Sequence, residues 1–308
     1  MSSLGRHCRS QKMGKCNAAA NRKGIAAPDL TILITEGSMI EKITSATNPR
    51  IKRLTALRKK AKIRREEQAF IIEGERLYRD TPREFLKEIY MTEEFLEQKL
   101  GRAAQEIGGA AQENITIITP QILQKISDTD TPQGVLCVAK MPSYDREDLL
   151  GDEKKGKPLL LILENIQDPG NLGTMMRTAE AAGVTGVLMS RDTVDLFNPK
   201  TVRATMSAIF RVPFLYTDDL VGEIQRLQAE NGIAVYAAHL RASKPYDEAD
   251  CRGACAFLIG NEGNGLTDEA ADAATARVHI PMQGNIESLN AAMAAGILLF
   301  EGARQRRI

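Results

Sequence analysis

The second half of the chain alternates short apolar runs with segments of helical periodicity. Residues 159–163 (LLLIL) form a continuous apolar run, which is typical of a strand that helices bury on both faces. Helical segments and short loops separate this run from later apolar runs. Such alternation predicts an α/β fold whose mainly parallel sheet is flanked by helices. The later strand-like runs are 184–190, 212–217, 233–240, 255–260 and 277–282.

The first half shows a smaller unit of the same kind, preceded by a segment without a clear pattern. Strand-like runs alternate with short helical segments over residues 41–141, which predicts a separate, smaller α/β domain. Residues 142–158 are polar, with Pro at both ends, and are predicted to be a linker to the domain 159–308. Residues 1–40 are dominated by basic and small polar residues, and we expect a poorly ordered basic tail there.

A basic helix is predicted near the start of the smaller domain. Residues 50–65 contain nine basic residues and no acidic residue. Ile51, Leu54, Leu57 and Ala61 recur at helical spacing, so one face can pack against a core while the other faces present cations. Such a surface suits the neutralisation of phosphates, although a solvated helix face has the same composition.

The charge distribution strengthens the case for a polyanionic partner. The net charge is only +1, but residues 1–65 hold 16 Lys and Arg against three acidic residues, so the rest of the chain is acidic. A basic N-terminal segment on an otherwise acidic chain favours nucleic acid as the ligand. The five cysteines form no CxxC pair and the three histidines form no cluster, so no metal is expected and a reducing cytoplasm is indicated. No apolar run is long enough to span a membrane, and the N-terminus does not resemble a secretory signal.

Three predicted strand ends carry an unusual density of glycine and polar residues: 165–174, 260–266 and 281–290. Ligands bind beyond the carboxyl ends of strands in parallel sheets, so these loops predict a single site. A dinucleotide site is weakly supported, because the GxGxxG pattern is absent. The loops also have simpler interpretations. The glycines of 260–266 can form a tight turn, and Ser288 and Asn290, with Ser288 at the expected N-cap, can simply cap a mostly buried helix.

Arg177 lies one to two turns into the helix that follows the first loop. Arginine is a poor base at its ordinary pKa, but its planar guanidinium suits bidentate contact with a phosphate. The simpler alternative is an ion pair with Glu180, three residues further along the same helix.

These loops carry a family resemblance. The segments NLGTMMRTAEAAG, IGNEGNGL and IPMQGNIESLNAAMAAGI, in that order, resemble the three signature motifs of the SpoU/TrmH family of S-adenosylmethionine-dependent RNA ribose 2′-O-methyltransferases. The resemblance covers residues 159–304. Residues 44–140, with NPRIKRLTALRKK, FIIEG and TPQGVL, resemble more loosely the ribosomal-protein-like RNA-binding domain of that family. The departures, Ala291 and Ala292 after SLN, affect no catalytic position.

The resemblance implies a trefoil-knotted catalytic domain that works as a homodimer, with each site at the subunit interface. It also implies roles for particular residues, with Arg177 engaging the target phosphate across the dimer. The donor S-adenosylmethionine would be held mainly by backbone near Leu258, Ile259, Gly260, Ile280, Met282 and Leu289. The catalytic and substrate-positioning residues would be Asn171, Arg177, Glu262, Ser288 and Asn290. RNA would contact Lys200 and Arg203 of NPKTVRATMS, and Arg50, Lys52, Arg53, Arg58, Lys59 and Lys60 of the basic helix.

The substrate is less defined than the chemistry. A separate recognition domain suits a large folded RNA, so 23S ribosomal RNA is the first expectation. Transfer RNA is an alternative substrate for the same reaction. A different class of function, a catalytically silent RNA-binding or ribosome-assembly protein of the same fold, is disfavoured by the intact set of candidate catalytic residues. The ribose hydroxyl itself would distinguish RNA from DNA.

Overall fold

The computed structural model describes residues 41–103, 115–152, 156–241 and 243–307. The chain divides into the units Met1–Met39 and Ile40–Ile308, and the described residues belong to the second. The tail predicted over residues 1–40 therefore lies outside the described residues. No helix in the described part of the chain is long and apolar enough to cross a membrane.

The smaller domain contains a mixed five-stranded sheet with the order β1-β4-β3-β5-β2. Strand β4 pairs in parallel with β1 and β3, whereas β5 runs antiparallel to β3 and β2. Helices α1 (Pro49–Lys59) and α5 (Pro120–Ile126) bury Leu54 and Ile122 with Ile71 and Leu136 of the sheet. The expected alternation of strands and short helices is found in this domain. The strands are β1 (Glu41–Ile43), β2 (Ala69–Glu73), β3 (Leu86–Met91), β4 (Ile115–Ile118) and β5 (Val135–Lys140).

The predicted single helix over residues 50–65 is wrong, because the chain forms two helices there. α1 ends at Lys59 and α2 (Ala61–Glu67) follows, with Lys60 in an extended conformation between them. The break lets Arg64, which is 3% exposed, turn back and donate to the carbonyl oxygens of Leu57 and Arg58 at 2.8 and 3.0 Å. Helix C-terminal carbonyls lack intrahelical donors, so the guanidinium satisfies groups that the break leaves open.

The larger domain contains a seven-stranded sheet with the order β10-β12-β9-β11-β6-β7-β8, and every neighbouring pair is parallel. The expected α/β fold with a mainly parallel sheet is confirmed. Strand β6 lies inside the sheet and is buried along its whole length, as its unbroken apolar sequence predicts. The strands are β6 (Leu159–Leu163), β7 (Gly186–Ser190), β8 (Phe214–Thr217), β9 (Ala234–Ala238), β10 (Lys244–Pro245), β11 (Cys255–Ile259) and β12 (Ala276–His279).

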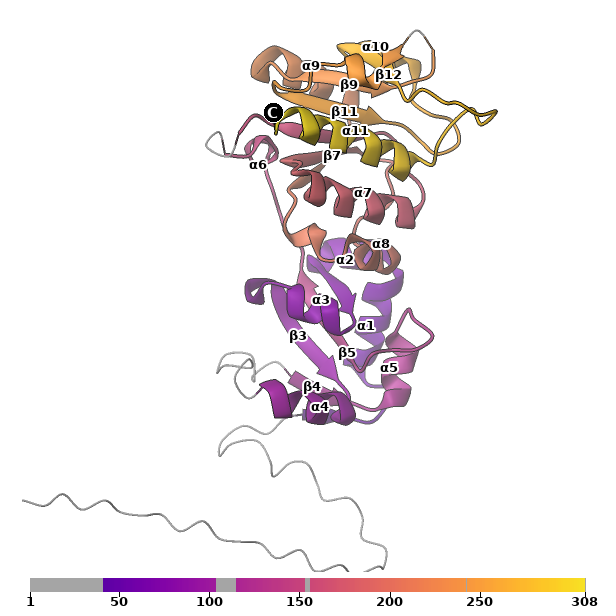
Figure 1. Cartoon of the computed structure of the whole chain (residues 1–308). Helices are drawn as coiled ribbons and strands as arrows, with labels where there is room; N and C mark the ends of the chain where they lie inside the picture. The colour runs from indigo at the N-terminus through magenta and orange to yellow at the C-terminus, as the bar shows by residue number, and fades with distance from the viewer. Residues whose placement is uncertain (1–40, 104–114, 153–155, 242, 308) are drawn as a thin grey trace, which may run out of the picture. The chain divides into compact units, whose positions relative to one another are not determined.

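Helices cover both faces of this sheet (Figure 1). α9 (Leu220–Asn231) and α10 (Asp268–Ala273) pack on the face that carries Ile162 and Leu258. α7 (Pro169–Ala182) and α11 (Ala291–Gln305) pack against each other, and Gly302 of α11 meets Phe257 and Leu159 of the opposite face. α8 (Pro199–Thr205) packs on α7.

The segment 142–158, predicted to be a linker, includes the short helix α6 (Arg146–Leu150). Asp145 and Asp148 form a reciprocal capping box at its start. Leu149 is 2% exposed and belongs to the core of the larger domain, so part of this segment is packed structure.

Residues of the smaller domain contact the segment between β7 and α8. Phe70 of β2 packs on Phe197 with ring centroids 4.9 Å apart. The buried Arg64 donates through Nε to Asp195 at 3.0 Å, and its Nη2 makes a second bond to the same carboxylate oxygen. This segment leads directly into α8, and α8 packs on α7.

Candidate active site

The carboxylate of Glu262 ties together loops that follow two neighbouring strands. Glu262 follows β11, and its Oε2 accepts from the backbone N–H of Gln167 at 3.0 Å. Its Oε1 accepts from the backbone N–H of Asp168 and from Nδ2 of Asn171, each at 3.0 Å. All three donors lie between β6 and the first turn of α7. Glu262 is therefore a fixed anchor for the loop after β6.

The third loop joins this network through Asn290. Its Nδ2 donates to Oδ1 of Asn171 at 3.0 Å, so Asn171 bridges Glu262 and Asn290. Asn171 and Asn290 are 119 residues apart in sequence. The structure thus brings together three of the predicted site residues, one from each loop.

The hydrogen bonds lower the pKa of Glu262. Burial alone would raise it, but the side-chain bond from Asn171 and the backbone bonds from Gln167 and Asp168 outweigh that effect. The pKa of Asp168 is also lowered, first by the backbone N–H of Asn171 and also by Lys200. Both carboxylates are therefore ionised at neutral pH, which suits an anchor and not a proton donor.

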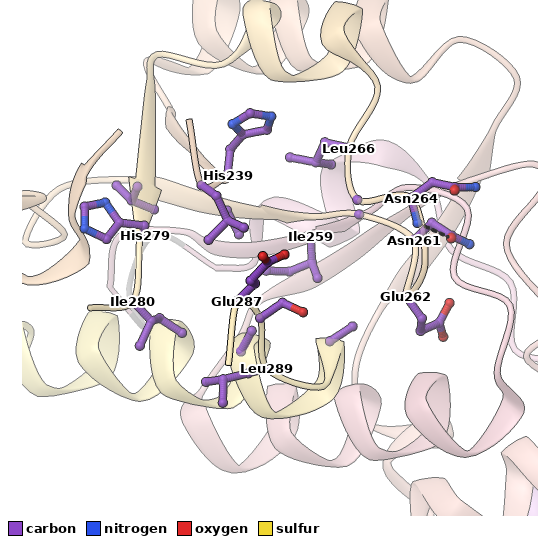
Figure 2. Close-up of a pocket in the computed structure, with 18 of the residues that line it drawn as sticks. His239, Ile259, Asn261, Glu262, Asn264, Leu266, His279, Ile280, Glu287 and Leu289 are labelled. Carbon is purple, nitrogen blue, oxygen red and sulfur yellow. Dashed lines mark hydrogen bonds between the residues drawn. The ribbon is translucent and has the colours of Figure 1, made fainter. Parts of the chain in front are cut away.

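A pocket of about 520 Å³ opens beside this network, among the loops after β9, β11 and β12 and the start of α11. Ile259, Ile280 and Leu289 contribute apolar side chains to it (Figure 2). The figure shows His239 and His279 toward one end of the pocket and Glu262 at the other. Its size and mixed lining are those of a cofactor site.

Most of the predicted donor-binding residues line this pocket, namely Ile259, Gly260, Ile280, Met282 and Leu289. Leu258 does not line it, because its side chain points into the core beneath α9 and α10. Sequence reasoning missed the wall that follows β9. The signal was available, since 233–240 was predicted to be a strand and its carboxyl end lies at the same edge. The missed wall consists of Ala238, His239, Leu240 and Arg241.

Gly260 is required by the loop itself. A Cβ built there would lie 2.3 Å from the carbonyl carbon of Gly265 and 2.4 Å from the backbone N of Leu266. Asn261 and Gly265 exchange two backbone hydrogen bonds, of 3.0 and 2.9 Å, that close the loop over Gly260. Glycine at position 260 thus serves close approach of one backbone segment to another, within the tight turn expected from the sequence.

Ser288 is not the N-cap of α11. Asn290 caps it instead, because its Oδ1 accepts from the backbone N–H groups of Ala292 and Met293 at 2.9 and 3.2 Å. Ser288 is exposed and lines the pocket. The expectation of a mostly buried helix is also incomplete, because Met293 and Phe300 are 61% and 46% exposed in the single chain.

Arg177 is exposed on α7. Its alternative partner, Glu180, is held by Arg211 through both carboxylate oxygens. No ion pair or hydrogen bond of the Arg177 side chain is found within the described residues. The surface pair of Arg177 with Glu180 is therefore not formed.

The predicted RNA-binding residues fall into two groups. Lys52, Lys59 and Lys60 are exposed. The others make contacts within the protein. Arg50 pairs with Glu41, Arg53 with Glu67 and Glu88, Arg58 with the Ser127 carbonyl, Lys200 with Asp168, and Arg203 with Asp128.

Comparison with known proteins places the chain in a family. Residues 158–300 match the SpoU rRNA Methylase family and residues 48–137 match the MRM3-like substrate binding domain. The chain is 33% identical over 261 residues to the 23S rRNA (guanosine(2553)-2′-O)-methyltransferase RlmP of Bacillus subtilis, covering 85% of this chain and 98% of that protein.

Solved structures agree with the sequence matches. The AdoMet-bound rRNA methyltransferase from Sinorhizobium meliloti has a TM-score of 0.73 at 33% identity, with 86% of this chain and 98% of that chain covered. An RNA 2′-O ribose methyltransferase has a TM-score of 0.69 at 31% identity, with 87% and 100% covered.

Fold, site and matches together define an RNA 2′-O-methyltransferase that uses S-adenosylmethionine. The chain belongs to the SpoU rRNA methylase family. The pocket suits the donor, because it offers apolar walls for an adenosine and backbone groups of the glycine-rich loop. Asp268 and Glu287 also line it, and their carboxylates favour a cationic ligand such as a sulfonium.

Proposed function

We propose that this protein methylates a ribose 2′-hydroxyl of 23S ribosomal RNA in the cytoplasm. The relative RlmP is named for that reaction, as is the RlmB of Ralstonia nicotianae, 35% identical over 187 residues. The smaller domain, residues 41–141, would recognise RNA, and residues 159–308 would carry the reaction. The trefoil knot expected of this family belongs to the same proposal.

Two observations support this proposal. Glu262, Asn171 and Asn290 are linked by hydrogen bonds, and Arg177, on the same helix as Asn171, is exposed while the nearby Glu180 pairs with Arg211. When bound, the donor would supply an electrophilic methyl group, whose bond to sulfur breaks as its bond to the ribose oxygen forms, while the hydroxyl proton is released to solvent. Arg177 would hold the phosphate beside the target ribose, because a guanidinium binds phosphate oxygens in a bidentate manner. Glu262, which lines the donor pocket, and Asn290 would hold Asn171 in one orientation. Ser288, exposed at the pocket, would contact the ribose.

The working unit would be a homodimer formed through α11. Met293 and Phe300 are seven residues apart, so they lie on one face of the helix, and both are strongly exposed in the single chain. Leu289 and Ile286, in the preceding loop, are also exposed, at 37% and 69%. Large apolar side chains gathered on one helix and its entry loop favour a protein partner. Thr178 of α7, next to Arg177 in sequence, lies against Gly296 of α11. An interface formed through α11 would therefore adjoin Arg177.

The direct test is methyl transfer from S-adenosylmethionine with a labelled methyl group to unmodified 23S ribosomal RNA, followed by mapping of the methylated ribose. Transfer RNA is the matched competing substrate. Labelled 23S RNA with wild-type protein, and none with Arg177→Ala or Arg177→Lys, is the expected result. Labelling of transfer RNA but not of 23S RNA would show that transfer RNA is the substrate. Absence of donor binding by calorimetry would indicate a silent RNA-binding protein.

The shared site has its own test. Arg177→Ala and Ser288→Ala chains, each inactive alone, should regain part of the activity when mixed, because one of the two sites of a mixed dimer would contain both native residues. Subunit exchange is verified by mass spectrometry of the mixture. Confirmed mixed dimers without activity would show that Arg177 does not act with the partner's Ser288.

A further inference from the structure

Glu180 lies where its carboxylate could pair with Arg177 and keep that side chain from binding RNA. The two residues are three positions apart on α7, a spacing at which acidic and basic side chains pair on a helix surface. A carboxylate in that position would compete with an RNA phosphate for the guanidinium and would repel the phosphate as well. The structure prevents this by giving Glu180 another partner.

That partner is Arg211, which engages both oxygens of the carboxylate. Its Nε donates to Oε1 of Glu180, and its Nη2 donates to Oε2 at 2.9 Å. Such a fork is the strongest arrangement for an arginine and a carboxylate. The side chains of Arg211 and Glu180 are 42% and 34% exposed, so solvent only partly screens the pair. The hydrogen bond that Arg211 donates to Glu180 also raises the pKa of Arg211, which stays charged.

The backbone around Arg211 holds its side chain next to Glu180. Arg211 follows a short 3-10 helix (Ala208–Phe210) whose three residues are all buried. Its backbone N–H donates to the Ala208 carbonyl at 2.9 Å, and its Nη2 also donates to the Met206 carbonyl at 3.2 Å. Met206 and Ser207 both have positive φ, of 49° and 71°, which is uncommon for residues other than glycine. The chain thus turns sharply between α8 and Arg211 and presents the guanidinium to α7.

We propose that Arg211 is a positioning residue for the methyl-transfer reaction. By occupying Glu180 it leaves Arg177 free to bind the phosphate beside the target ribose. The inference rests on the proposed role of Arg177 and adds a second arginine that acts only through Glu180. The negative charge of Asp80, in the smaller domain, also raises the pKa of Arg211, after the larger effect of Glu180.

The test is a double-mutant cycle with Arg211→Ala, Glu180→Gln and the double variant. Arg211→Ala should lower kcat/KM for 23S RNA by about threefold to tenfold at low salt, because Glu180 is then free to pair with Arg177. The loss should shrink as salt screens the released carboxylate. Glu180→Gln should retain wild-type activity, and the double variant should regain it. Donor affinity should be unchanged throughout.

The outcomes separate the inference from the proposed function. A fully active Arg177→Ala would remove the role of Arg177 and with it the basis of this inference. An inactive Arg177→Ala together with a fully active Arg211→Ala overturns only the role of Arg211. A purely structural pair predicts that Glu180→Gln is as damaging as Arg211→Ala and that the double variant is no better. A loss of activity that came only from lower stability of Arg211→Ala would also appear in the double variant, because both lack the Arg211 contacts. Recovery of activity in the double variant therefore excludes that explanation.

Discussion

Glu262 accepts hydrogen bonds from a side chain and from two backbone N–H groups of another loop. Its pKa is lower in the folded chain than the ordinary value of a glutamate side chain. A group with a depressed folded pKa stabilises the fold fully above its unfolded pKa, and that contribution is lost as pH falls through the folded pKa. Because the carboxylate is largely solvent-accessible, we expect a modest effect.

Glu262→Gln should therefore destabilise the protein at pH 7 and progressively less as pH falls through the acidic range. Glutamine cannot accept with both terminal atoms, so at least one of the three donors is left without its partner. Urea denaturation of both proteins at neutral pH and at several acidic values measures the difference. A difference in unfolding midpoint that stays constant with pH would contradict the assignment of the charge as the stabilising feature.

Two glycines of the same loop make a matched pair. Gly260→Ala forces a Cβ against the backbone of Gly265 and Leu266, so we expect a destabilisation of about 1–3 kcal/mol together with loss of donor binding. At Gly263 the nearest atom to an added Cβ is Asn261 Oδ1, at 3.6 Å, so Gly263→Ala should leave the stability unchanged. Thermal unfolding and calorimetry with S-adenosylmethionine are the measurements. Equal behaviour of the two variants would refute the steric argument.

At the level of single residues, the sequence predicted which side chains lie together at the site, but not the hydrogen bonds between them. The position of Asn171, Glu262 and Asn290 at strand ends, with the family resemblance, was enough to place them at one site. The contacts that organise them were not predictable, because they depend on backbone groups such as the N–H of Asp168. The pairing of Arg211 with Glu180 joins residues 31 apart whose packing follows from a left-handed turn that no sequence pattern revealed.

Helix α11 has one residue that serves two purposes at its start. Asn290 caps the helix with Oδ1 and bonds Asn171 with Nδ2. Asn290→Ala removes both interactions and should cost about 1 kcal/mol of stability as well as activity. Asn290→Asp keeps a capping oxygen but cannot donate to Asn171, so it should retain stability and lose turnover. Thermal unfolding beside methyl-transfer assays separates the two roles. Equal activity of Asn290→Asp and wild type would show that the bond to Asn171 is dispensable.

Boundaries of elements were the weaker part of the sequence prediction. Ser288 has the right chemistry for an N-cap, yet the helix begins only at Ala291, and Asn290 caps it two residues later. Nothing in the run 50–65 marks the break at Lys60, and Asp195, which the buried Arg64 contacts, lies 131 residues away in sequence. Central strands such as β6 were predictable, because burial on both faces leaves an unbroken apolar sequence.

At the scale of the whole molecule, the smaller domain presents three lysines that are free to meet RNA phosphates. Lys52 and Lys59 of α1 and Lys60, which follows it, are exposed, whereas Arg53 of α1 is held by Glu67 and Glu88. Neutralising a phosphate releases condensed counterions, so each lysine that binds RNA adds to the salt dependence of binding. The tethered arginine contributes less, because its charge is already balanced within the protein.

Replacement of Lys52, Lys59 and Lys60 together by Ala should therefore weaken RNA binding. The slope of log K against log salt should become shallower by about 0.7–0.9 for each phosphate that the variant no longer neutralises. Arg53→Ala is the matched control and should alter the slope by less than the value for one phosphate. Donor affinity should be unchanged in both variants, since the pocket lies among the loops of the larger sheet. Fluorescence anisotropy with an RNA fragment over a range of salt gives the slopes. A triple variant with the wild-type slope would show that this helix face is only solvated, and RNA recognition would then have to involve other cations of the chain.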